Sequence, residues 1–316
     1  MRIASSRLVI SALALLLGLP AAGLAEGHKI GVLLKGRTKF WSVVEQGAMD
    51  AGAKLGAQVI VKAPPAETDI AVQILMLNAL GASGVEAIVI APAHKTSLAQ
   101  AAAALAAKGI KIIVIDSPLE GNVASAFVGT NHRAAGEAAG TLLAGMVGDD
   151  AEITFFRHAQ NNAATTDRED GALEKLHAAH PKLHLHGDIY AGDDKAQQLE
   201  RAELVLSKYP ATKGILASGT PGTMAMLGLL AKRQPAGDIK FVGFGFNLND
   251  EVATALEAGT LHGWIAQQPR EIGFKGVETA LALLDGKTVP PSVSVDVFVV
   301  TKANLHEPQT QALLKL

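Results

Sequence analysis

The stretch KIGVLLKGRTKFWSVVEQGAMDAGAKLGAQVIVK, residues 29–62, specifies the fold class. Runs of valine, isoleucine and leucine at 30–34 and 59–62 have the composition of buried β-strands. Between them, apolar residues recur with the spacing of one helical face, at Val44, Ala48, Ala51 and Leu55. Gly56 follows at the point where such a helix would end. A strand, a helix and a second strand in this order predict a βαβ unit with parallel strands.

The alternation of strands and helices continues to the end of the chain. Further strands are expected at 87–90, 110–115, 127–128, 153–156, 183–189, 215–217, 241–244 and 264–266. Helices are expected at 70–80, 98–108, 131–147, 169–179, 195–207, 224–231, 251–258 and 272–284. About ten strands are too many for one sheet in a chain of this length. The sequence therefore predicts an α/β protein with two parallel sheets in two lobes, divided near 129–131, where only a short extended segment is expected.

The N-terminus has the pattern of a secretory signal peptide over residues 1–25. Arg2 and Arg7 precede an apolar run at 8–19, and Pro20 and small residues follow it. The apolar run is shorter than the roughly 18 to 20 residues needed to span a bilayer. The chain has no cysteine, which excludes a lipoprotein anchor, disulfides and thiolate-held metals. We therefore expect an exported protein that is not a lipoprotein.

The composition excludes some functions and favours a fold class. A formal net charge of −2 gives no general attraction to nucleic acid or acidic membranes. Hydrophobic residues make up 49% of the chain but aromatic residues only 4%. That combination suits parallel sheets of valine and isoleucine covered by alanine-rich and leucine-rich helices.

The candidate site residues follow the carboxyl ends of the strands, where open parallel sheets bind their ligands. They combine ring faces, carboxylates, amides and cations, and they lack a nucleophile–base pair. Such a set holds a polyhydroxylated ligand without transforming it, so no enzyme activity and no cofactor are expected. The predicted ligand-binding residues are Lys35, Thr38, Phe40, Trp41, Asp116, Asp167, Arg168, Ser218, Thr220, Asn247 and Gln267.

Structural roles compete with the ligand-binding ones. Phe40 and Trp41 open a helix, and only one of the two can face the core squarely. Asp116 has the alternative role of a helix cap or a hinge-bonding carboxylate, and Lys35 that of a solvated loop residue. Gln267 precedes Pro269, where the chain is expected to cross between lobes.

A cluster of histidines suggests a metal site, but its spacing argues against one. His177, His180, His184 and His186 span a helix end, a proline and the start of a strand, with no acidic or cysteine partner at ligand spacing. No phosphate-binding loop, dinucleotide fingerprint or nucleophile elbow occurs. We expect neither a metal nor a cofactor.

The chain after residue 25 resembles the ribose-type (type I) periplasmic substrate-binding proteins of sugar ABC importers. The matching strings are 30–32, 40–41 with 46–48, 112–116, 242–244, and 265–269 continuing through 272–273 to 275–278. The resemblance implies two Rossmann-like lobes joined by three crossovers, at 26–130 plus 268–296 and at 131–267 plus 297–316. It also implies a periplasmic monomer that closes at its hinge on a sugar or polyol and delivers it to an ABC permease in the inner membrane.

The resemblance implies roles for some of the candidate site residues, but other positions depart from the family. It places Phe40 and Trp41 against a sugar ring, Asp116 on a hydroxyl group and Gln267 beside the hinge. Three positions depart from the family. Gly219-Thr220 replaces an Asn-Asp pair, Gly245 replaces an aspartate, and Asp170 replaces an arginine, with Arg168 two residues earlier. These losses argue against plain ribose, galactose or glucose as the ligand.

Two other ligand classes remain open. Lys35, Asp116 and Thr166-Asp167 are similar to the pattern of the autoinducer-2-binding protein, although Arg168 replaces a glutamine and Ser218 a proline. An excess of cations could pair with a phosphate or carboxylate. These cations are Lys35, Arg37, Lys39, His94, Lys95, Arg157 and Arg168.

Other functional classes use the same fold. A sensory receptor for an autoinducer-2-like or anionic sugar ligand would report to a membrane kinase instead of a permease. A sugar-responsive repressor would need a helix-turn-helix where this chain has a signal peptide. An enzyme would need an acid–base pair, for which only Asp116 and Lys35 can be nominated.

Overall fold

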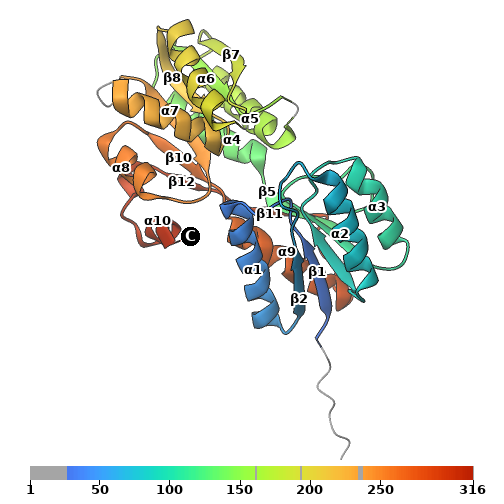
Figure 1. Cartoon of the computed structure of the whole chain (residues 1–316). Helices are drawn as coiled ribbons and strands as arrows, with labels where there is room; N and C mark the ends of the chain where they lie inside the picture. Colours follow the sequence, from blue (N-terminus) through green and yellow to red (C-terminus); the bar gives the residue numbers. More distant parts are fainter. Residues whose placement is uncertain (1–26, 161, 193, 234–237, 316) are drawn as a thin grey trace, which may run out of the picture.

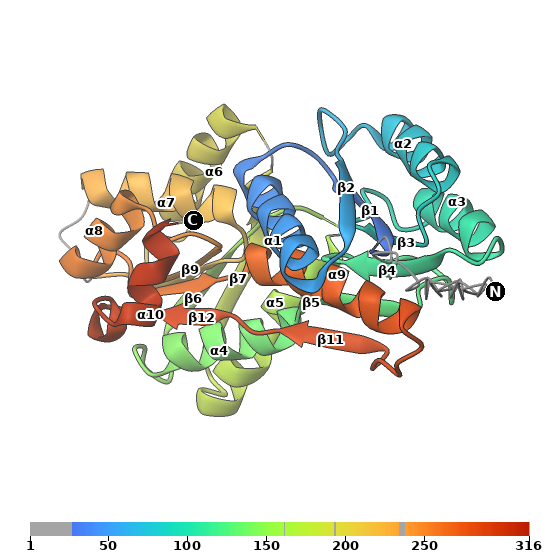
Figure 2. The same cartoon turned by 90° about the horizontal axis from the view of Figure 1, so that it is seen from below.

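The computed structural model describes residues 27–160, 162–192, 194–233 and 238–315. The predicted signal peptide at 1–25 lies outside the described residues. Within them, no helix has both the length and the apolar composition that a membrane crossing requires. The chain folds around two sheets, seen apart in Figure 1 and end to end in Figure 2.

The first sheet is wholly parallel and lies between two layers of helices. Its strand order is β11-β5-β4-β3-β1-β2. One face is covered by α1 and α9, and the other by α2 and α3. The inner strands β3 and β4 are buried on both faces, which explains their continuous Ile-Val composition. The bounds are β1 Lys29–Leu33, α1 Lys39–Leu55, β2 Gln58–Lys62, α2 Ile70–Ala82, β3 Ala87–Ile90, α3 Ser97–Ala106, β4 Lys111–Ile115, β5 Ala126–Thr130, α9 Pro269–Leu284 and β11 Ser292–Val295.

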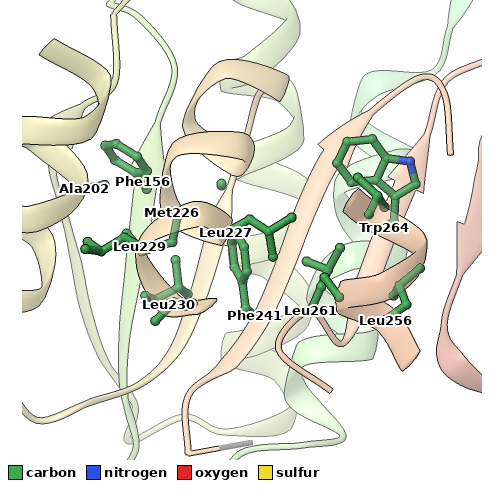
Figure 3. Packing of buried hydrophobic residues seen from close by; sticks show 14 of the residues in the cluster. Phe156, Ala202, Met226, Leu227, Leu229, Leu230, Phe241, Leu256, Leu261 and Trp264 are labelled. Carbon is green, nitrogen blue, oxygen red and sulfur yellow. The ribbon is translucent and has the colours of Figure 1, made fainter. Parts of the chain in front are cut away.

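The second sheet repeats this architecture, with the strand order β12-β10-β9-β8-β6-β7. Only β12 runs antiparallel to its neighbour. Helices α4 and α5 cover one face, and α6, α7 and α8 cover the other, whose core Figure 3 shows. The bounds are α4 His132–Ala144, β6 Glu152–Arg157, α5 Ala163–Ala179, β7 His184–Tyr190, α6 Lys195–Lys208, β8 Thr212–Ala217, α7 Thr220–Arg233, β9 Lys240–Gly245, α8 Asp250–Ala258, β10 Gly263–Ala266, β12 Phe298–Val300 and α10 Pro308–Gln311.

The chain passes between the two sheets three times. It leaves the first sheet after β5, returns after β10 and leaves again between β11 and β12. Two α/β sheets of this kind confirm the predicted fold class. The first sheet holds strands from 29–130 and 292–295, and the second holds strands from 152–266 and 298–300. The exact boundaries of the two lobes remain a prediction.

Several sequence expectations were wrong in detail. The segment at 127–128 belongs to a five-residue strand, β5, which pairs with β4 on one side and β11 on the other. The short strands β11 and β12 were not predicted. Helix α5 begins at Ala163 instead of 169, because the Asn162 side chain caps it by accepting from the Thr165 amide at 3.2 Å.

A glycine brings two helices of the first lobe into contact. A Cβ atom on Gly47 in α1 would lie 1.9 Å from the backbone oxygen of Arg270 in α9. A real Cβ never approaches an oxygen so closely, so only glycine allows this spacing. The same device recurs in the second lobe, where a Cβ on Gly136 in α4 would lie 2.0 Å from the Arg168 oxygen in α5. This contact fixes the position of Arg168 relative to the start of α4.

Candidate ligand-binding site

A lysine and an aspartate meet at the carboxyl ends of two strands of the first sheet. Lys35 follows β1 and Asp116 follows β4. The Lys35 Nζ donates to Asp116 Oδ2 at 2.7 Å and to Ser117 Oγ at 2.5 Å. The Ser117 hydroxyl also donates to Asp116 Oδ2, at 2.8 Å. Three polar groups are thus fixed together where this fold class binds ligands.

The backbone at Asp116 has an unusual conformation. Among the residues that the structure describes, it is the only non-glycine residue with a left-handed φ, at 65°. Such a conformation costs about 1–3 kcal/mol and is concentrated at functional sites. Aspartate tolerates it better than most residues, since its short side chain hydrogen-bonds locally. The strain supports a role for Asp116 beyond packing.

The carboxyl group of Asp116 stays ionised. Burial by itself would raise its pKa, but the charge of the Lys35 ammonium and its hydrogen bond outweigh that effect, so the pKa lies below its ordinary value. An ionised carboxylate accepts several hydrogen bonds at once. It can therefore bind adjacent hydroxyl groups of a ligand.

Arg168 organises the side chains around the crossovers. Its guanidinium is buried and donates to the Ser218 backbone oxygen at 2.9 Å and to Gln267 Oε1 at 2.8 Å. Its Nε lies 3.3 Å from His132 Nδ1. The Gln267 amide in turn donates to Thr130 Oγ1 at 3.2 Å. The network joins the end of β5, the start of α4 and the end of β10, and so connects two of the three crossovers.

Burial changes the protonation of this network. Desolvation, aided by the charge of Arg168, lowers the pKa of His132 to about 3, so the imidazole is neutral at physiological pH. Its Nδ1 must then be an acceptor, because guanidinium only donates. Desolvation also lowers the pKa of Arg168 to about 10, which leaves it charged at neutral pH.

A buried glutamate extends the network to the end of β6. Glu169 Oε1 accepts from the Ser218 hydroxyl at 2.7 Å, and Oε2 accepts from Arg157 Nε at 2.6 Å. Burial raises the pKa of Glu169 although both partners favour the charged form. Ser218 is therefore held by its hydroxyl and by its backbone oxygen.

The two neighbouring aromatic residues of α1 have different surroundings. The Trp41 side chain is only 3% exposed, lies in the core of the first lobe and donates from Nε1 to Glu67 Oε1 at 2.6 Å. The Phe40 ring is half-buried and contacts Phe246 of the second lobe edge-to-face, with centroids 5.3 Å apart. As the sequence anticipated, only one of the pair faces the core squarely.

A pocket of about 380 Å³ adjoins the crossovers. Asp116, Thr130 and His132 line it together with Asp167 of α5. It therefore receives polar side chains from both lobes.

The remaining predicted residues lie close to these elements. Thr38 precedes α1, Thr220 begins α7, and Asn247 lies half-buried two residues after β9. The structure thus brings Lys35 together with Asp116, and Arg168 with Ser218 and Gln267. That these eleven residues contact a ligand remains a prediction.

Sequence reasoning missed several residues of this region. His132 and Thr130 flank the end of β5, a strand that was expected to be only two residues long. Glu169 lies within a helix whose start was placed six residues too late. Phe246 directly follows the end of β9. Position after a strand end identified the other candidate residues, so the same criterion could have identified Phe246.

Part of the predicted cation excess is already paired with carboxylates. Lys95 pairs with Glu120 at 3.1 Å, and Arg157 pairs with Glu169 at 2.6 Å. Arg168 donates to neutral acceptors within the protein. Lys35, Lys95 and Arg157 are thus neutralised by carboxylates, whereas Arg168 keeps its charge among neutral acceptors.

The histidine cluster does not converge. His180 contacts the Ala144 oxygen at 2.9 Å and Asp149 Oδ1 at 2.8 Å, whereas His186 stacks on Tyr209 with centroids 3.9 Å apart. In the described part of the chain, no group of three or more histidine, aspartate or glutamate side chains is placed to hold a metal ion.

Residues 30–288 match the family model described as periplasmic binding protein domain. The chain belongs to this family, which agrees with the two-lobed architecture and the strand-end site. As a member of a family of binding proteins, it is a solute receptor and not an enzyme.

The chain is also similar to individual sugar-binding proteins and to solved structures of solute-binding proteins. The chain is 26% identical to the ribose import binding protein of Haemophilus influenzae, over 83% of this chain and 87% of that protein. It is 27% identical to the D-allose-binding periplasmic protein of Escherichia coli, over 79% of this chain and 83% of that one. An ABC transporter solute-binding protein of Agrobacterium vitis with bound D-fucose superimposes with a TM-score of 0.80 at 28% identity, covering 90% of this chain and 99% of that one.

Proposed function

We propose that the protein binds a neutral monosaccharide or polyol between its lobes and presents it to the permease of an ABC importer. The observation that carries the proposal is the fixed Lys35–Asp116 pair at the strand ends, which offers donors and an ionised acceptor with no net charge. Vicinal hydroxyl groups both donate and accept hydrogen bonds, so they fit such a pair. Relatives that bind ribose, allose and fucose support the sugar class.

Charge balance favours a neutral ligand over an anion. Lys35 is paired with Asp116, Arg157 with Glu169, and Arg168 donates to three groups of the protein itself. An anionic ligand that bound to one of these three cations would have to displace such a partner, which would leave a carboxylate or a buried acceptor unpaired.

Binding would act through the hinge. A ligand that contacts both lobes favours the closed arrangement by its differential affinity for that arrangement. The closed form would then dock on a permease in the inner membrane. We further propose that residues 1–25 direct export to the periplasm, that the mature protein is a monomer without a lipid anchor, and that it binds no nucleic acid.

A calorimetric screen of residues 26–316 tests the proposal. The panel contains D-ribose, D-allose, D-arabinose, D-fucose, D-galactose, D-glucose and xylitol, with ribose 5-phosphate and D-gluconate as anionic controls. We expect at least one neutral compound to bind with a Kd in the micromolar range or below. Binding of only the anionic compounds would refute the neutral class, and binding of none would refute the sugar receptor itself.

A further inference from the structure

Two phenylalanine rings form a contact between the lobes. Phe40 lies in the first turn of α1, and Phe246 directly follows β9. Their centroids are 5.3 Å apart and their planes meet at 90°, which is an edge-to-face contact. Among the described residues, Phe246 belongs to none of the four hydrophobic clusters. Its ring therefore contributes to the space between the lobes and not to a core.

Two glycines lie at the strand ends beside Phe246. Gly245 ends β9, and a Cβ there would lie 2.0 Å from the indole of Trp264. Gly219 follows β8, and a Cβ there would lie 3.1 Å from His158. These neighbours occupy the space, so a hydroxyl-binding side chain does not fit at Gly245 and fits at Gly219 only if His158 moves.

The backbone oxygens of the two glycines are also engaged. The Gly245 oxygen accepts from the Gln267 backbone N–H at 2.7 Å, and the Gly219 oxygen accepts from the Thr223 backbone N–H at 3.0 Å. On this wall Thr220 and Asn247 keep polar side chains, whereas Ser218, which directly follows β8, is buried and donates its hydroxyl to Glu169 at 2.7 Å. The ends of β8 and β9 thus offer few free polar groups to a ligand, in contrast to the Lys35–Asp116 pair.

We infer that Phe246 contacts the ligand and that, with Phe40, it covers an edge of the sugar bearing a methyl group or a hydrogen atom. The site then prefers a monosaccharide without a hydroxymethyl group at that edge. A hydroxyl buried against two phenyl rings loses water without gaining a partner, whereas a methyl group gains contact area. This inference rests on the proposed function and specifies its substrate class.

Matched sugar series test the inference by calorimetry. D-galactose, D-fucose and L-arabinose differ only in carrying hydroxymethyl, methyl or hydrogen at one ring carbon. D-glucose, 6-deoxy-D-glucose and D-xylose form a second series, and D-allose, 6-deoxy-D-allose and D-ribose a third. In the series that binds, we expect the methyl or hydrogen member to bind about tenfold or more tightly than the hydroxymethyl member.

Variants of Phe246 separate a ligand contact from a structural role. Phe246→Ala should weaken binding of the preferred member about tenfold and reduce its advantage over the hydroxymethyl member. Phe246→Asn should shift the preference toward the hydroxymethyl member, because the amide supplies a hydrogen-bonding partner. The matched control is Phe274→Ala, which removes a ring of α9 that lies beneath Lys54 of α1. It should leave both affinities unchanged.

The outcomes distinguish this inference from the proposed function. Equal or tighter binding of the hydroxymethyl member by the wild type would overturn the inference and leave the sugar receptor standing. Unchanged affinities in both Phe246→Ala and Phe246→Asn would do the same. If Phe246→Ala does not fold, Phe246→Asn and Phe246→Leu decide the question. Binding of no sugar by the wild type would overturn the proposed function and this inference together.

Discussion

The Lys35 ammonium lies 2.7 Å from the Asp116 carboxylate, although 81 residues separate the two in sequence. Parallel pairing brings them together, because β1 and β4 are each hydrogen-bonded to β3 and end at the same edge of the sheet. The pair fixes the ionised carboxylate in place before any ligand arrives. Preorganisation of this kind reduces the free-energy cost of binding.

Removing the Asp116 carboxylate should abolish or strongly weaken sugar binding. Asp116→Asn keeps the side-chain size and tolerates the left-handed backbone, so we expect an affinity loss of about 10- to 100-fold from lost charge-assisted hydrogen bonds. Titration of the best compound from the neutral panel measures the loss. Asp116→Gly, which relieves the backbone strain, should lose binding equally. Retained affinity in Asp116→Gly would assign Asp116 a purely structural role.

Arg168→Met should destabilise the protein by about 3 kcal/mol or more. The substitution leaves the Ser218 oxygen, Gln267 Oε1 and His132 Nδ1 buried without their donor, and each such group costs about 1–3 kcal/mol. Urea denaturation of the ligand-free protein measures the change. Arg270→Met removes an exposed arginine that pairs with Asp50 and should cost less than about 1 kcal/mol. Equal losses of unfolding free energy in the two variants would show that the buried hydrogen bonds of Arg168 do not stabilise the fold.

His132 should make the protein sensitive to acid. Its pKa is lowered to about 3 in the folded state, from 6.5, so between these values only the unfolded chain binds a proton at this residue. The free energy of unfolding contributed by His132 is therefore fully present above pH 6.5 and falls as the pH drops through this window. Urea titrations from pH 7.5 to 4 compare the wild type with His132→Gln, whose amide oxygen can still accept from Arg168. An equally steep decline in His132→Gln would show that other groups cause the acid sensitivity.

Two glycine-to-alanine substitutions should have opposite effects on stability. Gly47→Ala places a Cβ 1.9 Å from the Arg270 oxygen and forces α1 and α9 apart, which should cost about 2 kcal/mol or more. Gly228→Ala in α7 places a Cβ in open space and should stabilise by up to about 1 kcal/mol through helix propensity. Thermal denaturation of both variants provides the comparison. A neutral Gly47→Ala would show that the helix pair adjusts without loss.

Local sequence patterns were sufficient for the helices and the central strands. Strands such as β3 and β4 are buried on both faces, so composition alone marks them. The edge strands β11 and β12 have four and three residues and exposed or half-buried positions, so their pattern is too weak to identify them. Their pairing with β5 and β10 depends on residues more than 30 positions away in the chain.

The candidate site was also only partly predictable from local sequence patterns. Because parallel sheets bind ligands at the carboxyl ends of their strands, the sequence alone predicted that Lys35 and Asp116 lie at one edge of a sheet and that Gln267 lies at a strand end. Only the tertiary structure decided which polar atoms remain available. Gln267 and Arg168, 99 residues apart, bond to each other, whereas the carboxylate of Asp116 accepts from Lys35 and Ser117 through Oδ2. Helix and strand patterns arise from neighbours within a few residues, but burial, hydrogen-bond partners and the Phe40–Phe246 contact depend on segments that meet only after folding.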